Sequence, residues 1–189
     1  MSKRDDILWS AVSLMKEVGF EKTSVSQIVR HANVAQGTFY LYFQSKAELV
    51  LGIAQHIMDD FMSSLNDLNW NENVSLDQFI HSLVDLTYAH TQKHQALIGF
   101  CYSGTAYYNA VSKWDELYIP YYQWLSHKIM YYQNNNLCKS LYPPDALSNL
   151  LVGLMEHGAE QEYVFNYGLN TETSSIDVMK DFIKNAMAL

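Results

Sequence analysis

Apolar residues recur at helical spacing through the first 50 positions of the chain. One stripe runs from Ile7 to Val18, a second from Val25 to Ala32, and Phe39 and Phe43 form a third. Residues three or four apart share one face of a helix, so each stripe predicts a short amphipathic helix. The predicted helices span about 4–18, 25–32 and 36–43.

Longer stripes of the same spacing continue to the end of the chain. Polar breaks at 69–74 and at Asn134 to Asn136 separate them, and Pro120 is expected to kink or restart one helix. No window alternates with a period of two for long, so we predict an all-α chain. The predicted helices span about 45–68, 75–93, 112–133, 143–167 and 174–188, with a short helix and loops in 95–109.

Capping signals support these boundaries. Gly19 is a candidate C-terminal cap, and Asn33 tolerates the left-handed backbone of a sharp helix stop. Three pairs have the Ser-x-x-Gln/Glu spacing of a capping box, in which side chain and backbone of the first helical turn bond reciprocally. They are Ser24 with Gln27, Ser45 with Glu48, and Ser75 with Gln78.

Residues 23–46 have the layout of a helix-turn-helix. Two short helices are joined by a tight turn, and the second can lie in a DNA major groove. Phe39 and Phe43 share one face and should be buried. The side chains expected to point outward are Gly37, Thr38, Leu41 and Tyr42.

The same residues resemble the DNA-binding signature of the TetR family of bacterial transcriptional regulators. The resemblance covers roughly residues 5–50 and is carried by Thr23-Ser24-Val25, Ile28, Ala32, Val34, Gly37-Thr38-Phe39-Tyr40, Phe43, Lys46 and Leu49. It implies a three-helix helix-turn-helix DNA-binding domain over 1–46 and a larger helical ligand-binding and dimerisation domain over 47–189. It also implies a DNA-binding regulator and not an enzyme.

Carried over position by position, the resemblance implies contacts to a double-stranded DNA operator. The implied contact residues are Thr23, Ser24, Ser26, Gln27, Gln36, Gly37, Thr38, Tyr40, Leu41, Tyr42 and Lys46. Gln36 can bond adenine, Leu41 can pack on a thymine methyl, and Lys46 can meet a phosphate. Ala35 stands where the family usually has Ser or Thr, which removes a helix cap and a phosphate donor. The alternative is that Tyr40 and Tyr42 are ordinary core aromatics.

The net charge of −8 is unevenly divided. Residues 1–50 hold six Lys or Arg against five acidic residues, whereas residues 51–189 hold six Lys against fifteen. Phosphate attraction depends on charge near the contact surface, so the acidic second part does not exclude DNA binding. Because residues 1–50 carry a net charge of only +1, we expect a modest affinity for non-specific DNA. Neutral donors should then make many of the phosphate contacts.

Three features of the sequence indicate where in the cell the protein is located. Apolar runs are too short to span a bilayer, and the charged start MSKRDD passes directly into a helical pattern, so we expect neither a membrane span nor a signal peptide. Cys101 and Cys138 form no CxxC pair and are expected to be buried free thiols in a reducing cytoplasm. The alternative is a disulfide between them.

Aromatic residues concentrate in the second part, which has twelve of fourteen tyrosines, three of four tryptophans and no arginine. Aromatics with a carboxylate favour a small hydrophobic or aromatic effector, including a cationic one, and the lack of Arg disfavours an acyl-CoA. The candidate ligand-binding residues are Phe100, Tyr107, Trp114, Tyr118, Tyr121, Trp124, Glu156 and Glu160. Tyrosines at helical spacing are alternatively half-buried packing, and the two glutamates a solvated strip.

The last two predicted helices offer an apolar strip that includes a small residue. Members of the family pair through these helices into a four-helix bundle, so the resemblance implies a homodimer and a palindromic operator. The candidate interface residues are Leu150, Leu154, Gly158, Phe182 and Ile183.

Catalysis and cofactors find little support in the sequence. No nucleophile and base are paired. His90 and His94 are four residues apart and could ligate a metal, but without a third ligand we expect none, and no cofactor. The sequence favours a repressor released from its operator by a ligand. An activator, or a small-molecule-binding or catalytic helical protein that keeps the N-terminal unit only as scaffold, stays open.

Overall fold

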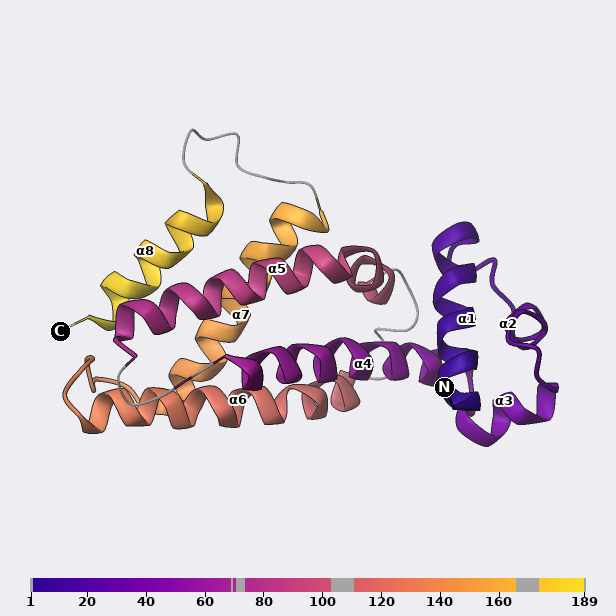
Figure 1. Ribbon diagram of the computed structural model, residues 1–189, viewed down its shortest axis with the longest axis horizontal. Coiled ribbons are helices and arrows are strands. Elements are labelled where there is room, and N and C mark those ends of the chain that lie inside the picture. The colour runs from indigo at the N-terminus through magenta and orange to yellow at the C-terminus, as the bar shows by residue number, and fades with distance from the viewer. Residues whose placement is uncertain (1, 69, 71–73, 103–110, 166–173, 189) are drawn as a thin grey trace. The chain divides into compact units, whose positions relative to one another are not determined.

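The computed structural model describes residues 2–68, 70, 74–102, 111–165 and 174–188, and these residues form eight α-helices and no strand (Figure 1). This confirms the all-α prediction. The helices are α1 Lys3–Val18, α2 Val25–His31, α3 Gln36–Tyr42, α4 Lys46–Asp67, α5 Leu76–Tyr102, α6 Val111–Asn134, α7 Pro144–Tyr163 and α8 Ser175–Met187.

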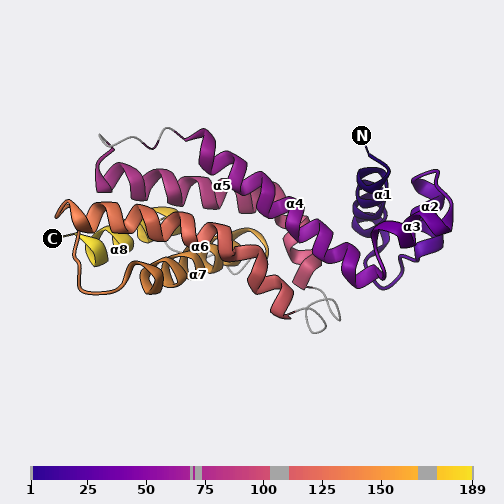
Figure 2. The same cartoon turned by 90° about the horizontal axis from the view of Figure 1, so that it is seen from below.

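The chain packs as two compact units, each made of two segments of the chain. The first unit comprises Met1–Asp59 and Ala96–Leu117, and the second comprises Asp60–Gln95 and Tyr118–Leu189. Helices α4, α5 and α6 therefore each contribute residues to both units. Figure 2 shows α4 as one unbroken purple helix, about 30 Å long at 1.5 Å per residue. None of the described helices is both long and apolar enough to cross a membrane.

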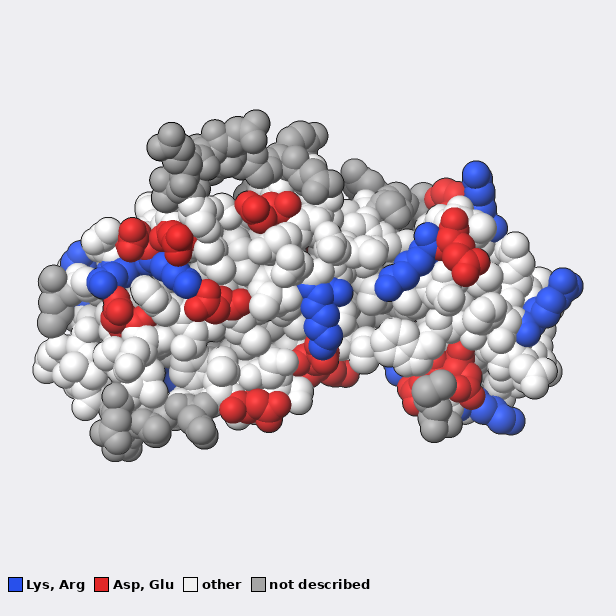
Figure 3. All heavy atoms as spheres, turned by 45° about the horizontal axis from the view of Figure 1, so that its top comes forward, with Lys and Arg blue, Asp and Glu red and all other residues white. Residues whose placement is uncertain are grey.

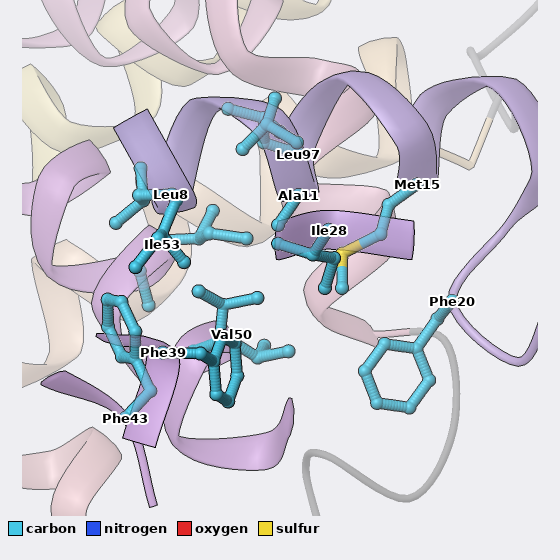
Figure 4. Close-up of a cluster of buried hydrophobic side chains, with 14 of the residues drawn as sticks. Leu8, Ala11, Met15, Phe20, Ile28, Phe39, Phe43, Val50, Ile53 and Leu97 are labelled. Atoms are coloured by element: carbon cyan, nitrogen blue, oxygen red, sulfur yellow. The ribbon is translucent and has the colours of Figure 1, made fainter. Parts of the chain in front are cut away.

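The core of the first unit is apolar and is built mainly from α1 to α4 and the end of α5. Leu8 and Met15 of α1, Ile28 of α2, Phe39 of α3 and Ile53 of α4 are all buried in it (Figure 4). Leu97 and Cys101, near the end of α5, complete this core. A helix of seven residues is marginal in water by itself, so α2 and α3 depend on burying these side chains.

Local signals set several helix ends as predicted. Gly19 has φ +84° at the end of α1, and Asn33 has φ +52° in the turn between α2 and α3. The Ser75 and Gln78 pair forms its reciprocal bonds at the start of α5. At α4 the box is only half formed, because the Glu48 carboxylate accepts from the Gln44 amide at 2.5 Å and not from Ser45.

Two predicted helix ends were wrong. The fifth helix was expected to stop near Lys93, but α5 continues to Tyr102, so the described part of 95–109 is no separate helix. The seventh ends at Tyr163, short of the predicted Tyr167. Pro120 lies inside α6 without restarting it.

The second unit combines an aromatic cluster with close helix packing. The Phe79 ring contacts the rings of Trp70, Trp124 and Tyr132, and the two tryptophan rings contact each other. The Tyr132 hydroxyl donates to the carbonyl of Val74 at 2.9 Å. Helices α7 and α8 contact each other, with the Met179 methyl of α8 close to the α7 backbone at Gly158. Cys101 and Cys138 are buried free thiols, as predicted, and burial raises both of their pKa values.

Candidate nucleic-acid interface

Helix α2 begins with the predicted capping box. The Ser24 hydroxyl accepts from the Gln27 amide at 3.2 Å, and the Gln27 side-chain oxygen accepts from the Ser24 amide at 2.8 Å. These bonds satisfy two of the backbone donors that every helix start leaves open. Ser24, Ser26 and Gln27 are all exposed, so their polar groups can meet a ligand.

Helix α3 divides its side chains between core and solvent. Phe39 and Phe43 are buried with their rings 5.8 Å apart, as the spacing predicted. Leu41 is 82% exposed, and Tyr40 and Tyr42 are also exposed, which removes the alternative of two core tyrosines. The Leu41 side chain contributes little packing at this exposure, but it can contact a thymine methyl in a major groove.

The start of α3 is open. Ala35 is its N-cap and makes no side-chain cap bond, as its identity predicted, and both Gln36 and Gly37 are exposed. Thr38 is partly buried. The first backbone amides of a helix have no partner within the helix and attract anionic oxygens. At the start of α3 these amides are accessible to phosphates.

Two predicted contact residues point inward. The Thr23 side chain is buried, and its hydroxyl donates to the Gly19 carbonyl at 2.8 Å. The Lys46 ammonium donates to the carbonyls of Phe20 at 2.7 Å and Thr23 at 3.0 Å. It also lies 3.9 Å from the centre of the Phe20 ring. Lys46 therefore ties the start of α4 to the loop between α1 and α2, a role that sequence spacing did not indicate.

Positive charge is thinly distributed. Figure 3 shows Lys and Arg as separate patches among acidic and uncharged atoms on the face drawn, not as one continuous basic surface. Arg4 lies with its guanidinium 5.4 Å from the Phe43 ring centre. That neutral donors make many of the phosphate contacts stays a prediction.

The candidate ligand-binding residues do not gather at one place. Phe100 and Trp114 pack against the core of the first unit. Tyr121 is fully buried in the second unit against the Phe61 ring, 4.9 Å between centres, whereas Trp124 belongs to the aromatic cluster with Trp70. The prediction for Tyr107 lies outside the described residues.

Tyr118, Glu156 and Glu160 do come together. The Tyr118 hydroxyl donates to the Glu156 carboxyl, and Glu160 follows one helical turn later with its side chain buried. Burial and, to a smaller extent, the negative charge of Glu160 raise the pKa of Glu156 to about 8, although the Tyr118 hydrogen bond acts in the opposite direction. Glu156 is therefore mostly protonated at pH 7 and can donate as well as accept a hydrogen bond.

The candidate dimer residues divide between surface and interior. Leu150 is 69% exposed, and Leu154 and Phe182 are exposed as well. Ile183 is buried within its own chain. At Gly158 an added Cβ would meet Tyr88 and Met179 of the same chain. Only the first three side chains are therefore available to a partner.

One cluster of polar side chains was not predicted from the sequence. Asp60 of α4 lies against His90, Lys93 and His94 of α5. The Lys93 hydrogen bond, with a smaller contribution from His94, holds the pKa of Asp60 at about 2 against the effect of burial. The histidine pair was visible as an i, i+4 spacing, but nothing local indicated a carboxylate thirty residues earlier.

Comparison with known proteins agrees with this architecture. Residues 7–53 match the bacterial regulatory proteins of the tetR family, and residues 80–187 match the tetracyclin repressor-like C-terminal domain. An uncharacterized HTH-type transcriptional regulator of Bacillus subtilis, YvdT, is 32% identical over 187 residues, covering 98% of this chain and 95% of the relative.

Solved structures share the fold. The transcriptional regulator FadR of Bacillus subtilis, in complex with stearoyl-CoA, superposes with a TM-score of 0.71 at 16% identity over 95% of both chains. A SmeT–triclosan complex superposes with a TM-score of 0.76 at 13% identity, covering 100% of this chain and 93% of the other. Matches at both ends of the chain and along its whole length show that this protein belongs to the TetR family of DNA-binding, ligand-responsive transcriptional regulators.

Proposed function

We propose that this regulator is a homodimeric repressor that leaves a palindromic operator when a small hydrophobic or aromatic molecule binds its C-terminal part. The observation that carries the DNA-binding half is α3, which buries Phe39 and Phe43 while Tyr40, Leu41 and Tyr42 face solvent. A two-fold dimer would present two such helices to successive major grooves, about one DNA turn apart.

The dimer is supported by exposed apolar side chains on the last two helices. Leu150 and Leu154 of α7 and Phe182 of α8 are exposed in the single chain, and burying such side chains is what stabilises obligate dimers. Replacing Leu150 and Phe182 by Glu should give monomers by light scattering and weaken operator binding. The matched control is Leu41→Glu, which should weaken operator binding but leave the dimer intact.

The effector is expected to contact Tyr118, Glu156 and Glu160, the candidate residues that lie together. A protonated Glu156 suits an uncharged hydrogen-bonding ligand. A cation would instead favour the ionised carboxylate, so its binding at pH 7 should release a proton. Calorimetry in two buffers of different ionisation enthalpy separates these ligand classes.

An acyl-CoA is the competing effector class, since the FadR structure of similar fold contains stearoyl-CoA. Against it, residues 51–189 contain no Arg, the side chain best suited to bidentate phosphate capture. Thermal-shift measurements with aromatic cations, neutral aromatics such as triclosan, and acyl-CoAs would distinguish the classes, because bound ligand raises the melting temperature by mass action.

The deciding experiment is operator release. A fluorescent fragment of the promoter upstream of the protein's own gene should bind, and unlabelled operator but not random DNA should compete. A ligand that raises the melting temperature should then weaken operator binding, because it shifts the population toward a form that does not fit DNA. Saturating ligand that leaves operator affinity unchanged would contradict the proposed release, and ligand-enhanced transcription from the bound promoter would indicate an activator.

A further inference from the structure

Three side chains of the second unit converge by their polar atoms. The Nε2 atom of His94 lies 2.9 Å from Oδ2 of Asp60, and the Nε2 atom of His90 lies 3.4 Å from the same oxygen. The three possible ligand atoms all lie within 4.8 Å of one another. Both imidazoles are therefore aimed at one carboxylate oxygen.

The two distances from Asp60 fit ligands around a single cation. Metal–nitrogen and metal–oxygen bonds of about 2.0–2.2 Å, set roughly 90–110° apart, separate two ligand atoms by about 2.8–3.6 Å. The distances from Oδ2 of Asp60 to the two Nε2 atoms both fall in this range. His90 and His94 are four residues apart on α5, the spacing at which two imidazoles on one helix face bind a single ion.

Burial and ligand type narrow the choice of ion. The two histidine side chains are 9% exposed, whereas Asp60 is 29% exposed and leaves a route from solvent. Imidazole with one carboxylate suits zinc, nickel, cobalt and non-haem iron, whereas magnesium and calcium prefer all-oxygen sites. The donor set therefore selects a divalent transition metal.

Lys93 is the natural competitor of such an ion. Its ammonium lies 2.7 Å from Oδ2 of Asp60, so three nitrogens surround an oxygen that has only two lone pairs. The Lys93 side chain is 60% exposed and can turn into solvent, unlike the two histidines. An ammonium and a metal cation cannot both occupy the same side of one carboxylate oxygen.

We propose that Asp60, His90 and His94 form a binding site for one divalent transition-metal ion, which displaces Lys93 from Asp60. Both imidazoles bind through Nε2 in their neutral form. Three protein ligands leave at least one coordination position for water or for a donor atom of another molecule. The ion would join α4 to α5 inside the second unit and thereby stabilise it.

The test uses the full-length chain without an affinity tag, stripped with a chelator and then titrated with Zn²⁺, Ni²⁺ and Co²⁺. Isothermal calorimetry should give one ion per chain, and Co²⁺ should produce visible absorption bands. X-ray absorption of the Zn²⁺-loaded wild type should show two imidazole ligands, a readout that does not depend on any variant folding.

Variants assign the site. His94→Gln and Asp60→Asn should each weaken Zn²⁺ binding by about 100-fold or more, since changes in the outer shell of metal sites already cause 10–100-fold losses. His81→Gln is the matched control, because His81 also lies on α5 four residues from a carboxylate, Asp77, but is exposed. It should leave Zn²⁺ affinity unchanged. Lys93→Gln should tighten Zn²⁺ binding by removing the competing ammonium.

Three outcomes would overturn the proposal. Absence of stoichiometric binding in the wild type would reduce the cluster to an ion pair with Lys93. Equal affinity in wild type, His94→Gln and Asp60→Asn would place the ion elsewhere. Unchanged or weaker binding in Lys93→Gln would contradict the exchange. None of these results bears on operator binding, so the site and the proposed repressor function can fail separately.

Discussion

The two units bury different kinds of side chain. In the described part of the first unit, the buried polar side chains are Ser10 and Thr23, both neutral, and the buried thiol of Cys101 also lies in this core of aliphatic and aromatic groups. The second unit buries two histidines and a glutamate, and also encloses the Glu156 carboxyl. Ionisable groups are costly to remove from water, and their pKa values or partners must change to permit it.

This difference suggests that the first unit is a rigid scaffold and that the second unit responds to ligands. The first unit uses apolar packing to hold two seven-residue helices, so that the exposed face of α3 has one defined shape. The second unit buries ionisable side chains, and such side chains are often found where proteins bind ligands or ions. If stability and response divide in this way, substitutions in the two units should have different effects.

The largest effect is expected at Phe39. Replacing this fully buried ring by Ala should lower the free energy of unfolding by about 3–5 kcal/mol and abolish operator binding, because α3 loses its anchor. Its counterpart on the same helix is Leu41→Ala, which should change stability by less than about 0.5 kcal/mol but weaken operator binding by about 1 kcal/mol. Urea denaturation and fluorescence anisotropy measure the two quantities. Equal stability losses in both variants would contradict the division of α3.

The next effect is the pH dependence carried by Glu156. Its pKa of about 8 exceeds the ordinary 4.5, so the folded protein holds a proton that the unfolded chain has lost between these values. Stability from this group is therefore complete below pH 4.5 and is lost as pH rises toward 8, by as much as about 1.4 kcal/mol per pH unit.

Glu156→Gln should remove that slope, because the amide stays neutral at every pH. Denaturation series from pH 5 to 8 provide the measurement, with Glu17→Gln on the exposed face of α1 as the control that should follow the wild type. A Glu156→Gln series that runs parallel to the wild type would show that the carboxyl is not held protonated.

Lys46 links the stability of the first unit to DNA binding. Lys46→Gln should lower stability by about 2 kcal/mol, because the ammonium bonds to Phe20 and Thr23 are lost. If Lys46 also meets a phosphate, the salt dependence of operator binding should fall by about one charge. Lys16→Gln, at an exposed position of α1, controls for net charge. A salt slope equal to that control would leave Lys46 a purely structural role.

The smallest effect separates two glycines of α7. At Gly158 a Cβ would lie 2.6 Å from the Met179 methyl and 2.7 Å from the Tyr88 hydroxyl, so Gly158→Ala should destabilise the protein by about 1–2 kcal/mol. At Gly153 nothing lies within 4 Å, and Gly153→Ala should add up to about 1 kcal/mol of helix stability. Thermal melts of both variants measure this. Equal shifts would mean that α8 does not pack closely on α7.

The sequence by itself determined the features that arise within one or two helical turns. The 3.6-residue period placed Phe39 and Phe43 inward and Leu41 outward, the Ser24 and Gln27 pair started α2, and Asn33 took the left-handed backbone of the turn. Each of these depends on side chains and backbone groups close in sequence, so local spacing was sufficient to predict them.

Only the tertiary structure decided which distant residues meet. The Lys46 ammonium donates to carbonyls more than twenty residues earlier in the chain, and Ile183 is buried. Helix α5 continues past Lys93 because Leu97 and Cys101 are buried in the core of the first unit. Asp60 became the third group beside His90 and His94 only when α4 and α5 packed together. Periodicity gives the face of a helix but not the neighbour that covers it, because that choice depends on how all the helices bury their apolar faces together.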